Sequence, residues 1–289
     1  MRTSHTVERP AELLTYLFAT FADVKKTSVR QWLKHGSIEV NGRSVTQFNH
    51  PLQVGDVVSL RTKEESLAEA RLPATIKVLF EDAALLVVEK AASLLSMASE
   101  TEREKTAYAL LTDYVRRGNP RSSERVWIVH RLDRDASGLM VFAKSEAAKL
   151  ALQASWHEAD KRYLAVVEGS PPAEQGVFAS HLNESNPYKV YSGPPGEHTR
   201  HAVTKYRVVK RNAGRTLIEL TLQTGRRNQI RVHLADAGCA IVGDRKYGAR
   251  TNPAQRLGLH ACALKFKHPL SGEMLRFESP LPRELASLV

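Results

Sequence analysis

The first forty residues show hydrophobic positions at helical spacing. Leu and Phe side chains recur every three to four positions in residues 10–21, which predicts a helix there. Residues 25–36 predict a second, basic helix, with Thr27 or Ser28 as its N-cap and Gly36 as its stop. Two short helices are therefore expected to open the chain.

Strand-like patterns follow these helices. Asn41 and Gly42 lie between β-type triplets, which is typical of a two-residue hairpin turn. Residues 50–60 predict a further turn and strand. Helices and strands together predict a small mixed unit over residues 1–62.

A mostly polar and charged stretch separates this unit from the rest of the chain. Residues 62–71 contain five acidic or basic side chains, show no strand pattern and end just before Pro73. We therefore expect a linker over residues 63–72 and a second domain over residues 73–289.

Strand patterns dominate that second domain. Runs of β-branched, Leu and aromatic residues predict strands at 75–82, 85–90, 126–130, 139–144, 162–169, 202–210 and 216–222. Helical patterns occur at 104–117, 146–159 and 228–237. Because strands outnumber helices and follow one another directly, the predicted fold class is α+β, built on an antiparallel or mixed sheet.

The chain is basic. Its 289 residues contain 42 Lys and Arg against 31 Asp and Glu, a formal net charge of +11. Residues 200–250 alone hold twelve Lys or Arg and three acidic residues. This excess favours an anionic partner such as nucleic acid, although a solvated basic face is the simpler alternative.

Other composition features narrow the class of protein further. Cys239 and Cys262 belong to no CxxC pair, so neither a disulfide framework nor a zinc ribbon is expected. The histidines show no ligand spacing, and we expect no metal and no cofactor. The N-terminus has no apolar signal region, and no apolar run approaches the roughly 20 residues of a membrane span. These features predict a cytoplasmic protein without a membrane partner.

The segment RLDRDASG, residues 131–138, joins two predicted strands. Such connections often hold catalytic groups on a rigid scaffold. Asp133 lies between Arg131 and Arg134 in the sequence. Opposite charge favours the ionised carboxylate, so Asp133 is interpreted as a nucleophile or a base and not as a proton donor. A surface ion-pair loop explains this segment, taken alone, equally well.

Five ordered motifs resemble the RluA-type family of RNA pseudouridine synthases. They read HRLDRDASGL from residue 130, KRYLAVVEG from 161, TGRRNQIRVHLA from 224, GDRKYG from 243 and LHACALKFKHPLSG from 259. This resemblance spans residues 76–282. Residues 10–62 are similar to the α-L RNA-binding domain of the S-four ribosomal-protein type, in which a basic helix face contacts RNA. The resemblance implies an enzyme that isomerises uridine in RNA.

The resemblance also assigns roles to single residues. Asp133 matches the essential aspartate, Arg231 the arginine that pairs with it, and Tyr163 the tyrosine that stacks on the flipped base. Arg131 matches the arginine that enters the base stack where the target uridine is flipped out. RNA contacts are expected from Arg131, Arg134, Arg226, Arg227, Lys25, Lys26, Arg30 and Lys34.

Three positions depart from the family pattern. Ala136 stands where Thr is usual, Asn228 where His is usual, and Ala91 where Pro is usual. None of these changes removes Asp133, Tyr163 or Arg231.

The implied reaction breaks the bond from uridine N1 to the ribose and bonds C5 to the same ribose carbon. Nothing is oxidised, so neither cofactor nor metal is required. A carboxylate near the ribose can attack the anomeric carbon or act as a base at the neighbouring carbon, and the sequence leaves both open. The Tyr163 hydroxyl is a candidate base for the final proton on C5.

Several alternatives stay open at this point. Ribosomal RNA is the favoured substrate because of the α-L resemblance, with transfer RNA as the alternative, and a monomer is expected. A catalytically inactive RNA-binding or ribosome-assembly factor is a second interpretation, against which the intact Asp133, Tyr163 and Arg231 argue. A glycosidase using Asp133 with Asp135 is a third, which their close spacing and the basic surface disfavour.

Overall fold

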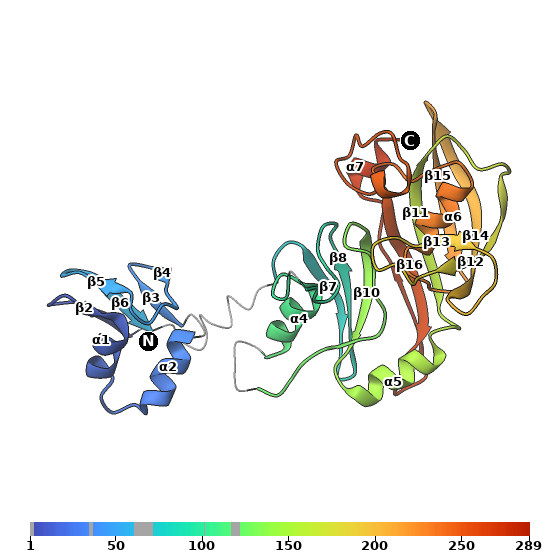
Figure 1. The fold of residues 1–289 in the computed structure, drawn as a ribbon. Coiled ribbons are helices and arrows are strands. Elements are labelled where there is room, and N and C mark those ends of the chain that lie inside the picture. The colour runs from blue at the N-terminus through green and yellow to red at the C-terminus, as the bar shows by residue number, and fades with distance from the viewer. Residues whose placement is uncertain (1–2, 35–36, 61–71, 101, 117–121) are drawn as a thin grey trace. The chain divides into compact units, whose positions relative to one another are not determined.

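The computed structural model describes residues 3–34, 37–60, 72–100, 102–116 and 122–289 (Figure 1). The chain divides into two compact units. The first unit comprises Met1–Leu72 and Asp113–Glu124, and the second comprises Pro73–Thr112 and Arg125–Val289. The linker predicted over 63–72 lies, apart from Leu72, outside the described residues.

The first unit contains the two expected helices. Helix α1 (Leu13–Thr20) buries Leu13 and Leu17, and α2 (Lys26–Lys34) buries Val29. The N-cap prediction for α2 is wrong. Thr27 and Ser28 lie inside the helix, because the Lys25 carbonyl accepts hydrogen bonds from the N–H groups of Ser28 (2.7 Å) and Val29 (3.3 Å). Gly36, the predicted stop, lies outside the described residues.

Short strands complete the first unit. They are β1 (Thr3–Thr6), β2 (Ala11–Glu12), β3 (Ile38–Val40), β4 (Arg43–Ser44), β5 (Pro51–Leu52) and β6 (Val57–Leu60), with one sheet in the order β1-β6-β3-β4 and a second formed by β2 and β5. The predicted hairpin turn is confirmed: Asn41 and Gly42 join β3 to β4 with φ angles of 53° and 76°. Both angles suit a primed two-residue turn.

The second unit is built on one mixed sheet of eleven strands among its described residues. The order is β13-β12-β14-β15-β11-β16-β10-β8-β7, with β17 on β16 and β9 on β10. The strands are β7 (Ile76–Glu81), β8 (Leu85–Lys90), β9 (Trp127–Ile128), β10 (Ser137–Ala143), β11 (Asp160–Glu168), β12 (Gln175–Asn183), β13 (Tyr191–Gly193), β14 (Thr199–Asn212), β15 (Arg215–Leu222), β16 (Leu259–Lys267) and β17 (Met274–Glu278). The predicted α+β class with a mixed sheet is confirmed.

Strand β16 joins the two halves of this sheet (Figure 1). One edge of β16 pairs with β11, and the other pairs first with β10, in parallel, and then with β17. The contact with β10 needs a glycine. A Cβ on Gly138 would lie 2.2 Å from the Ala261 carbonyl oxygen, and the φ of Gly138 is +114°. The small residue that ends the RLDRDASG loop thus lets two strands meet.

The three predicted helices are present with slightly shorter bounds, as α4 (Ala107–Arg116), α5 (Glu146–Ser155) and α6 (Gln229–Asp236). The last residues of α4 belong to the first unit. The 3-10 turn η1 (Arg245–Tyr247) and the short helix α7 (Arg283–Ala286) were not predicted. Strand β9 is shorter than the predicted 126–130. The N–H of Val141 on the facing strand donates to the His130 ring (3.1 Å) instead of to a backbone carbonyl, so the ladder stops. Among the described residues, no helix has the length and apolar character needed to cross a bilayer.

Candidate active site

The loop between β9 and β10 places Asp133 at a cavity in the second unit. This cavity has a volume of about 770 Å³. Its wall includes the loop with Arg131 and Asp133, strand β11 with Tyr163, and helix α6 with Arg231 together with the segment before that helix. Residues nearly a hundred positions apart in the sequence therefore face one space.

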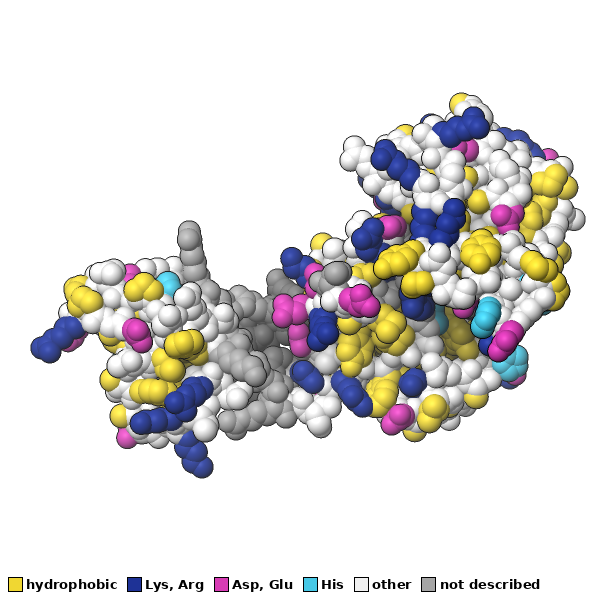
Figure 2. Space-filling model, viewed as in Figure 1, with side chains coloured by type: hydrophobic (Ala, Val, Ile, Leu, Met, Phe, Trp, Pro, Cys, Tyr) yellow, Lys and Arg dark blue, Asp and Glu magenta, His cyan; other side chains and the backbone are white. Residues whose placement is uncertain are grey.

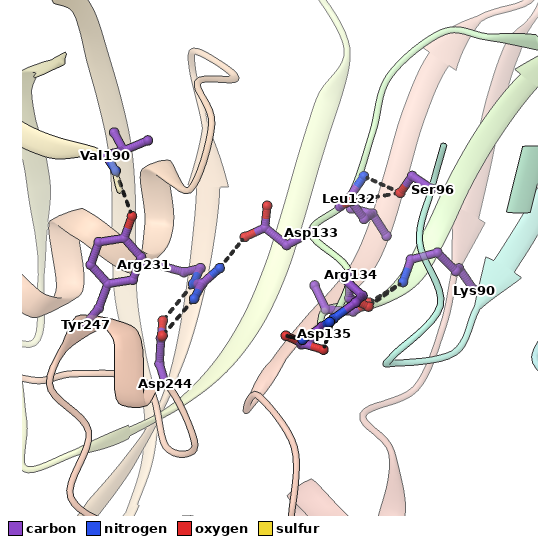
Figure 3. A network of polar contacts seen from close by, with 11 residues as sticks. Lys90, Ser96, Leu132, Asp133, Arg134, Asp135, Val190, Arg231, Asp244 and Tyr247 are labelled. Carbon is purple, nitrogen blue, oxygen red and sulfur yellow. Dashed lines mark hydrogen bonds and ion pairs between the residues drawn. The ribbon is translucent and has the colours of Figure 1, made fainter. Parts of the chain in front are cut away.

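Arg231 lies between two carboxylates (Figure 3). Its Nη1 donates to Oδ2 of Asp133 at 3.1 Å, while Nε and Nη2 donate to the two oxygens of Asp244, each at 2.7 Å. Asp244 is buried, with 2% of its surface exposed. Bidentate pairing of this kind fixes the plane of a guanidinium. Asp244 therefore orients Arg231, and Arg231 in turn orients Asp133.

The electrostatics of this triad keep Arg231 charged. Burial alone would lower the pKa of its guanidinium, but the hydrogen bonds and charge of Asp244, with a contribution from Asp133, raise it above its ordinary value. The guanidinium also stands 4.9 Å from the centre of the Tyr247 ring. The Tyr247 hydroxyl accepts a hydrogen bond from the Val190 N–H at 3.2 Å, which ties η1 to the loop before β13.

Tyr163 lies on β11 and is almost fully buried in the cavity wall. Burial, and next the negative charge of Asp133, raise the pKa of its hydroxyl well above the ordinary value. The side chain therefore stays a neutral phenol at physiological pH. It offers an aromatic face together with a polar hydroxyl.

Lys90 lies beside the Asp133 loop and holds its backbone (Figure 3). Its buried Nζ lies within hydrogen-bond distance of four carbonyls, two near β8 (Ala91, 2.9 Å; Leu94, 2.8 Å) and two in the loop (Arg134, 3.1 Å; Ala136, 2.7 Å). Burial lowers the pKa of Lys90 to about 7. The loop is thus held through its backbone on the C-terminal side of Asp133.

Ser96 holds the other side of the same loop. Its hydroxyl donates to the Leu132 carbonyl at 2.7 Å and accepts from the Leu132 N–H at 3.2 Å. Both neighbours of Asp133 in the loop are therefore anchored, which limits the positions open to its carboxylate.

The arginines predicted beside Asp133 have different partners. Arg134 pairs with Asp135, 3.0 Å apart, and is exposed. The expectation that Arg134 flanks the Asp133 carboxylate is therefore wrong, because the turn directs Arg134 toward its sequence neighbour. Arg131 is exposed, lines the cavity and pairs with no carboxylate among the described residues. The cation paired with Asp133 is Arg231, which is distant in sequence.

Two further predicted RNA contacts lie at the cavity, before α6. Arg226 is exposed, and its Nε donates to the His201 carbonyl at 3.2 Å. The guanidinium of Arg227 donates to the carbonyls of Glu184 (3.2 Å), Asn186 (2.5 Å) and Pro187 (2.8 Å). Arg227 therefore anchors the loop after β12, which leaves little of its donor capacity for a ligand.

The RNA contacts predicted in the first unit lie on and before α2. Lys25, Lys26 and Arg30 are exposed, and the side chain of Lys34 lies outside the described residues. Lys26 and Arg30 stand over the Phe18 ring, 5.6 and 5.3 Å from its centre. Figure 2 shows Lys and Arg side chains on the displayed face of each unit.

The three departures from the family pattern lie in different local settings, and nothing in the structure explains the one at Ala136. Asn228 precedes α6 with φ at 53°, a left-handed conformation in which Asn and His are both enriched. The Ala91 N–H donates to the Thr75 carbonyl at 2.9 Å, a bond that Pro could not make. Ala136 is buried, and its carbonyl accepts from Lys90. None of these departures alters the Asp133–Arg231 pair.

Sequence reasoning missed Lys90, Ser96 and Asp244. Asp244 belongs to the GDRKYG motif, and the place of this motif in the family pattern was the only sequence feature that pointed to a role for Asp244. Lys90 ends a predicted strand, and a lysine in that position usually points to solvent. Among the described residues, no group of three His, Cys, Asp or Glu side chains could hold a metal ion.

Comparison with known proteins agrees with this geometry. Residues 84–236 match the family model described as RNA pseudouridylate synthase. An uncharacterized RNA pseudouridine synthase of Bacillus subtilis, YlyB, is 32% identical over 99% of this chain and 96% of its own length. Ribosomal large subunit pseudouridine synthase D of Vibrio cholerae is 32% identical over 93% of this chain and 87% of its own length.

A solved structure has the same fold. The human RNA pseudouridylate synthase domain containing 4 superposes with a TM-score of 0.62 at 22% identity, over 78% of this chain and 95% of its own. Together with the two sequence relatives, the family match covers the sheet and the loop that bears Asp133. The chain belongs to the RluA-type family of RNA pseudouridine synthases.

Proposed function

We propose that this enzyme isomerises a uridine of ribosomal RNA, with Asp133 as the essential carboxylate. The observation that carries the proposal is the Asp133–Arg231 pair, 3.1 Å long, at a cavity also lined by Tyr163. Several relatives, from Vibrio, Xanthomonas and Haemophilus, are named ribosomal large subunit pseudouridine synthase D. Transfer RNA is the alternative substrate. The proposal includes action as a monomer in the cytoplasm.

The cavity is suited to a uridine turned out of its helix. Extrusion of a base costs a few kcal/mol of stacking, and a side chain that fills the gap offsets part of this cost. Arg131 is exposed at the cavity and free of a carboxylate partner in the described chain, which suits that task. Tyr163 presents its ring to the cavity, where it would stack on the base.

Asp133 then reacts with the ribose in one of two ways. It attacks the anomeric carbon and displaces uracil, or it removes a proton from the neighbouring carbon. Arg231 keeps the carboxylate aimed in either case. After uracil rotates, C5 bonds to the anomeric carbon and loses its proton. Because its pKa is raised, the Tyr163 hydroxyl is protonated. It can accept the C5 proton only if it gives its own proton to another group at the same time.

The first unit would supply additional RNA affinity as an α-L domain. Lys25 just before helix α2, and Lys26 and Arg30 on it, are exposed on a small folded unit of helices and strands. Lys and Arg that meet phosphates release counterions and strengthen binding without reading sequence. Arg134 and Arg226 would add phosphate contacts near the cavity, whereas Arg227 is already engaged by carbonyls.

The substrate is tested by mapping pseudouridines in cellular RNA. Cells that lack the gene should lose one or a few pseudouridines in large-subunit ribosomal RNA. The unaltered gene should restore them, and a copy with Asp133→Asn should not. Loss of pseudouridine from transfer RNA alone would replace the proposed substrate, and restoration by Asp133→Asn would remove Asp133 from the reaction.

A further inference from the structure

A second buried cation faces the cavity from strand β11. Lys161 and Tyr163 are two residues apart, so their side chains share one face of the strand. Both are buried, at 8% and 9% exposure, whereas Arg162 between them is exposed on the opposite face. Lys161 also lines the same cavity as Tyr163 and Asp133.

The ammonium of Lys161 makes little use of its donors. Its Nζ donates to the Trp156 carbonyl at 2.8 Å and pairs with no carboxylate among the described residues. Burial lowers the pKa of Lys161, although the charge of the neighbouring Asp160 opposes this shift. A lysine ammonium has three donors, and a buried charge with one neutral acceptor is costly. An electron-rich ligand group in the cavity would reduce that cost.

Aromatic rings line the cavity beside Lys161, whose Nζ stands 6.0 Å from the centre of the Trp156 ring. The His130 and Trp156 rings stack 4.7 Å apart, and both line the cavity. Burial, and then the charge of Lys161, lower the pKa of His130 to about 3, so the imidazole is uncharged. The His130 Nε2 is occupied by the Val141 N–H. Lys161 is therefore the positive group of this part of the wall.

Lys161 differs in burial from Arg131 and Arg226, the candidates for phosphate binding. Arg131 and Arg226 are exposed and can meet the RNA backbone at the surface, whereas Lys161 is within reach only of a group that enters the cavity. In an extruded nucleotide that group is the base, while its phosphates stay with the strand. The ligand of Lys161 should thus be a polar atom of the base.

We propose that Lys161 donates a hydrogen bond to a carbonyl oxygen of the flipped uracil and stabilises the charge of uracil as it leaves the ribose. When the N1–C1′ bond breaks, its electron pair goes to N1 and spreads onto O2 and O4. This holds whether Asp133 attacks C1′ or takes a proton from C2′. When C5 bonds to C1′, uracil returns those electrons, and the C5 proton leaves. The proposal rests on the proposed base flipping.

The first test separates leaving-group stabilisation from binding. Lys161→Met removes the charge at similar volume, and Arg162→Met is the matched control on the opposite face, where Arg162 pairs with Asp160. At saturating RNA labelled with tritium at C5, single-turnover release should fall at least about 10²-fold for Lys161→Met, the usual loss for one preorganised donor. RNA affinity should change less than about twofold, and Arg162→Met should resemble the parent. Lys161→Arg should retain more activity than Lys161→Met.

The second test uses a better leaving group. Fluorine at C5 withdraws electrons and stabilises the uracil anion. The rate loss caused by Lys161→Met should therefore be at least about tenfold smaller for consumption of 5-fluorouridine in RNA than for consumption of uridine. Equal losses on both RNAs would overturn the proposal, as would weaker RNA binding with an unchanged rate at saturation, which indicates a phosphate contact. Should Lys161→Met fail to fold, the same comparison is made with Lys161→Gln, which also removes the positive charge. If the Lys161 proposal is wrong, the parent should still be active and Asp133→Asn inactive. If the proposed function is wrong, that difference in activity should be absent as well.

Discussion

At the scale of single residues, Arg231 connects the reacting carboxylate to the scaffold. Two of its three contacts go to Asp244, which contributes nothing to the cavity itself but sets the plane of the guanidinium. The Asp133 carboxylate then receives one donor at a fixed position. Small displacements of a reacting group cost large factors in rate, so Asp244 should be a positioning residue.

Replacement of Asp244 tests this role. Asp244→Asn keeps the shape but faces Arg231 with an amide NH₂ in place of one oxygen. We expect single-turnover activity to fall by about 10²-fold, with RNA affinity nearly unchanged. The free energy of unfolding should drop by about 2 kcal/mol or more, because a buried ion pair is weakened. Unchanged activity, despite lower stability, would show that Arg231 keeps its position without Asp244.

Lys90 gives a prediction about pH. Its pKa is about 7 in the folded protein and about 10.5 in the unfolded chain, so folding releases a proton between these values. Stability contributed by this site should therefore rise with pH from about 7 to about 10.5. Chemical unfolding of the parent and of Lys90→Met at several pH values gives the difference in their free energies of unfolding. A constant difference would mean that the four carbonyls keep Lys90 charged in the folded state.

At the scale of elements, the β10–β16 pairing connects the two halves of the sheet and places the Asp133 loop. Gly138→Ala would push a methyl group into the Ala261 backbone, so we expect a loss of about 2 kcal/mol or more in stability. Gly214→Ala is the matched control, because Gly214 has φ at +78° but no atom within 4 Å of a new Cβ. Equal losses in thermal unfolding would assign the effect to backbone strain alone.

The sequence predicted the elements better than their contacts. Asn41 and Gly42 determine their hairpin locally, so the prediction holds, and the loop containing Asp133 lies between strands as expected. The N-cap of α2 failed because Lys25 satisfies the first N–H groups through its carbonyl, a role any residue can take. The functions of Lys90 and Asp244 depend on carbonyls and a guanidinium far away in the chain. Local pattern holds no information about such partners.

At the scale of the whole molecule, the positive charge is spread over both units. Lys25, Lys26 and Arg30 are exposed on the first unit, and Arg131 and Arg226 on the second. If this surface contacts phosphates, changing Lys25, Lys26 and Arg30 together to Gln should weaken RNA binding. The slope of its salt dependence should flatten by about 0.7 per lost contact in single-stranded regions. Titrations at several salt concentrations measure this slope. An unchanged slope would mean that α2 does not touch the substrate.

Asp133 is the residue on which the proposed chemistry depends, and Asp135 in the same loop provides its control. Asp133→Asn keeps the shape but loses the charge, whereas Asp135→Asn changes a half-buried carboxylate that pairs with Arg134. The most direct measurement is single-turnover tritium release from RNA labelled at C5 of uridine. We predict a loss of at least about 10³-fold for Asp133→Asn, with unchanged RNA affinity, and a rate within about threefold of the parent for Asp135→Asn. Release by Asp133→Asn within about tenfold of the parent would contradict the assignment of Asp133 as the essential carboxylate.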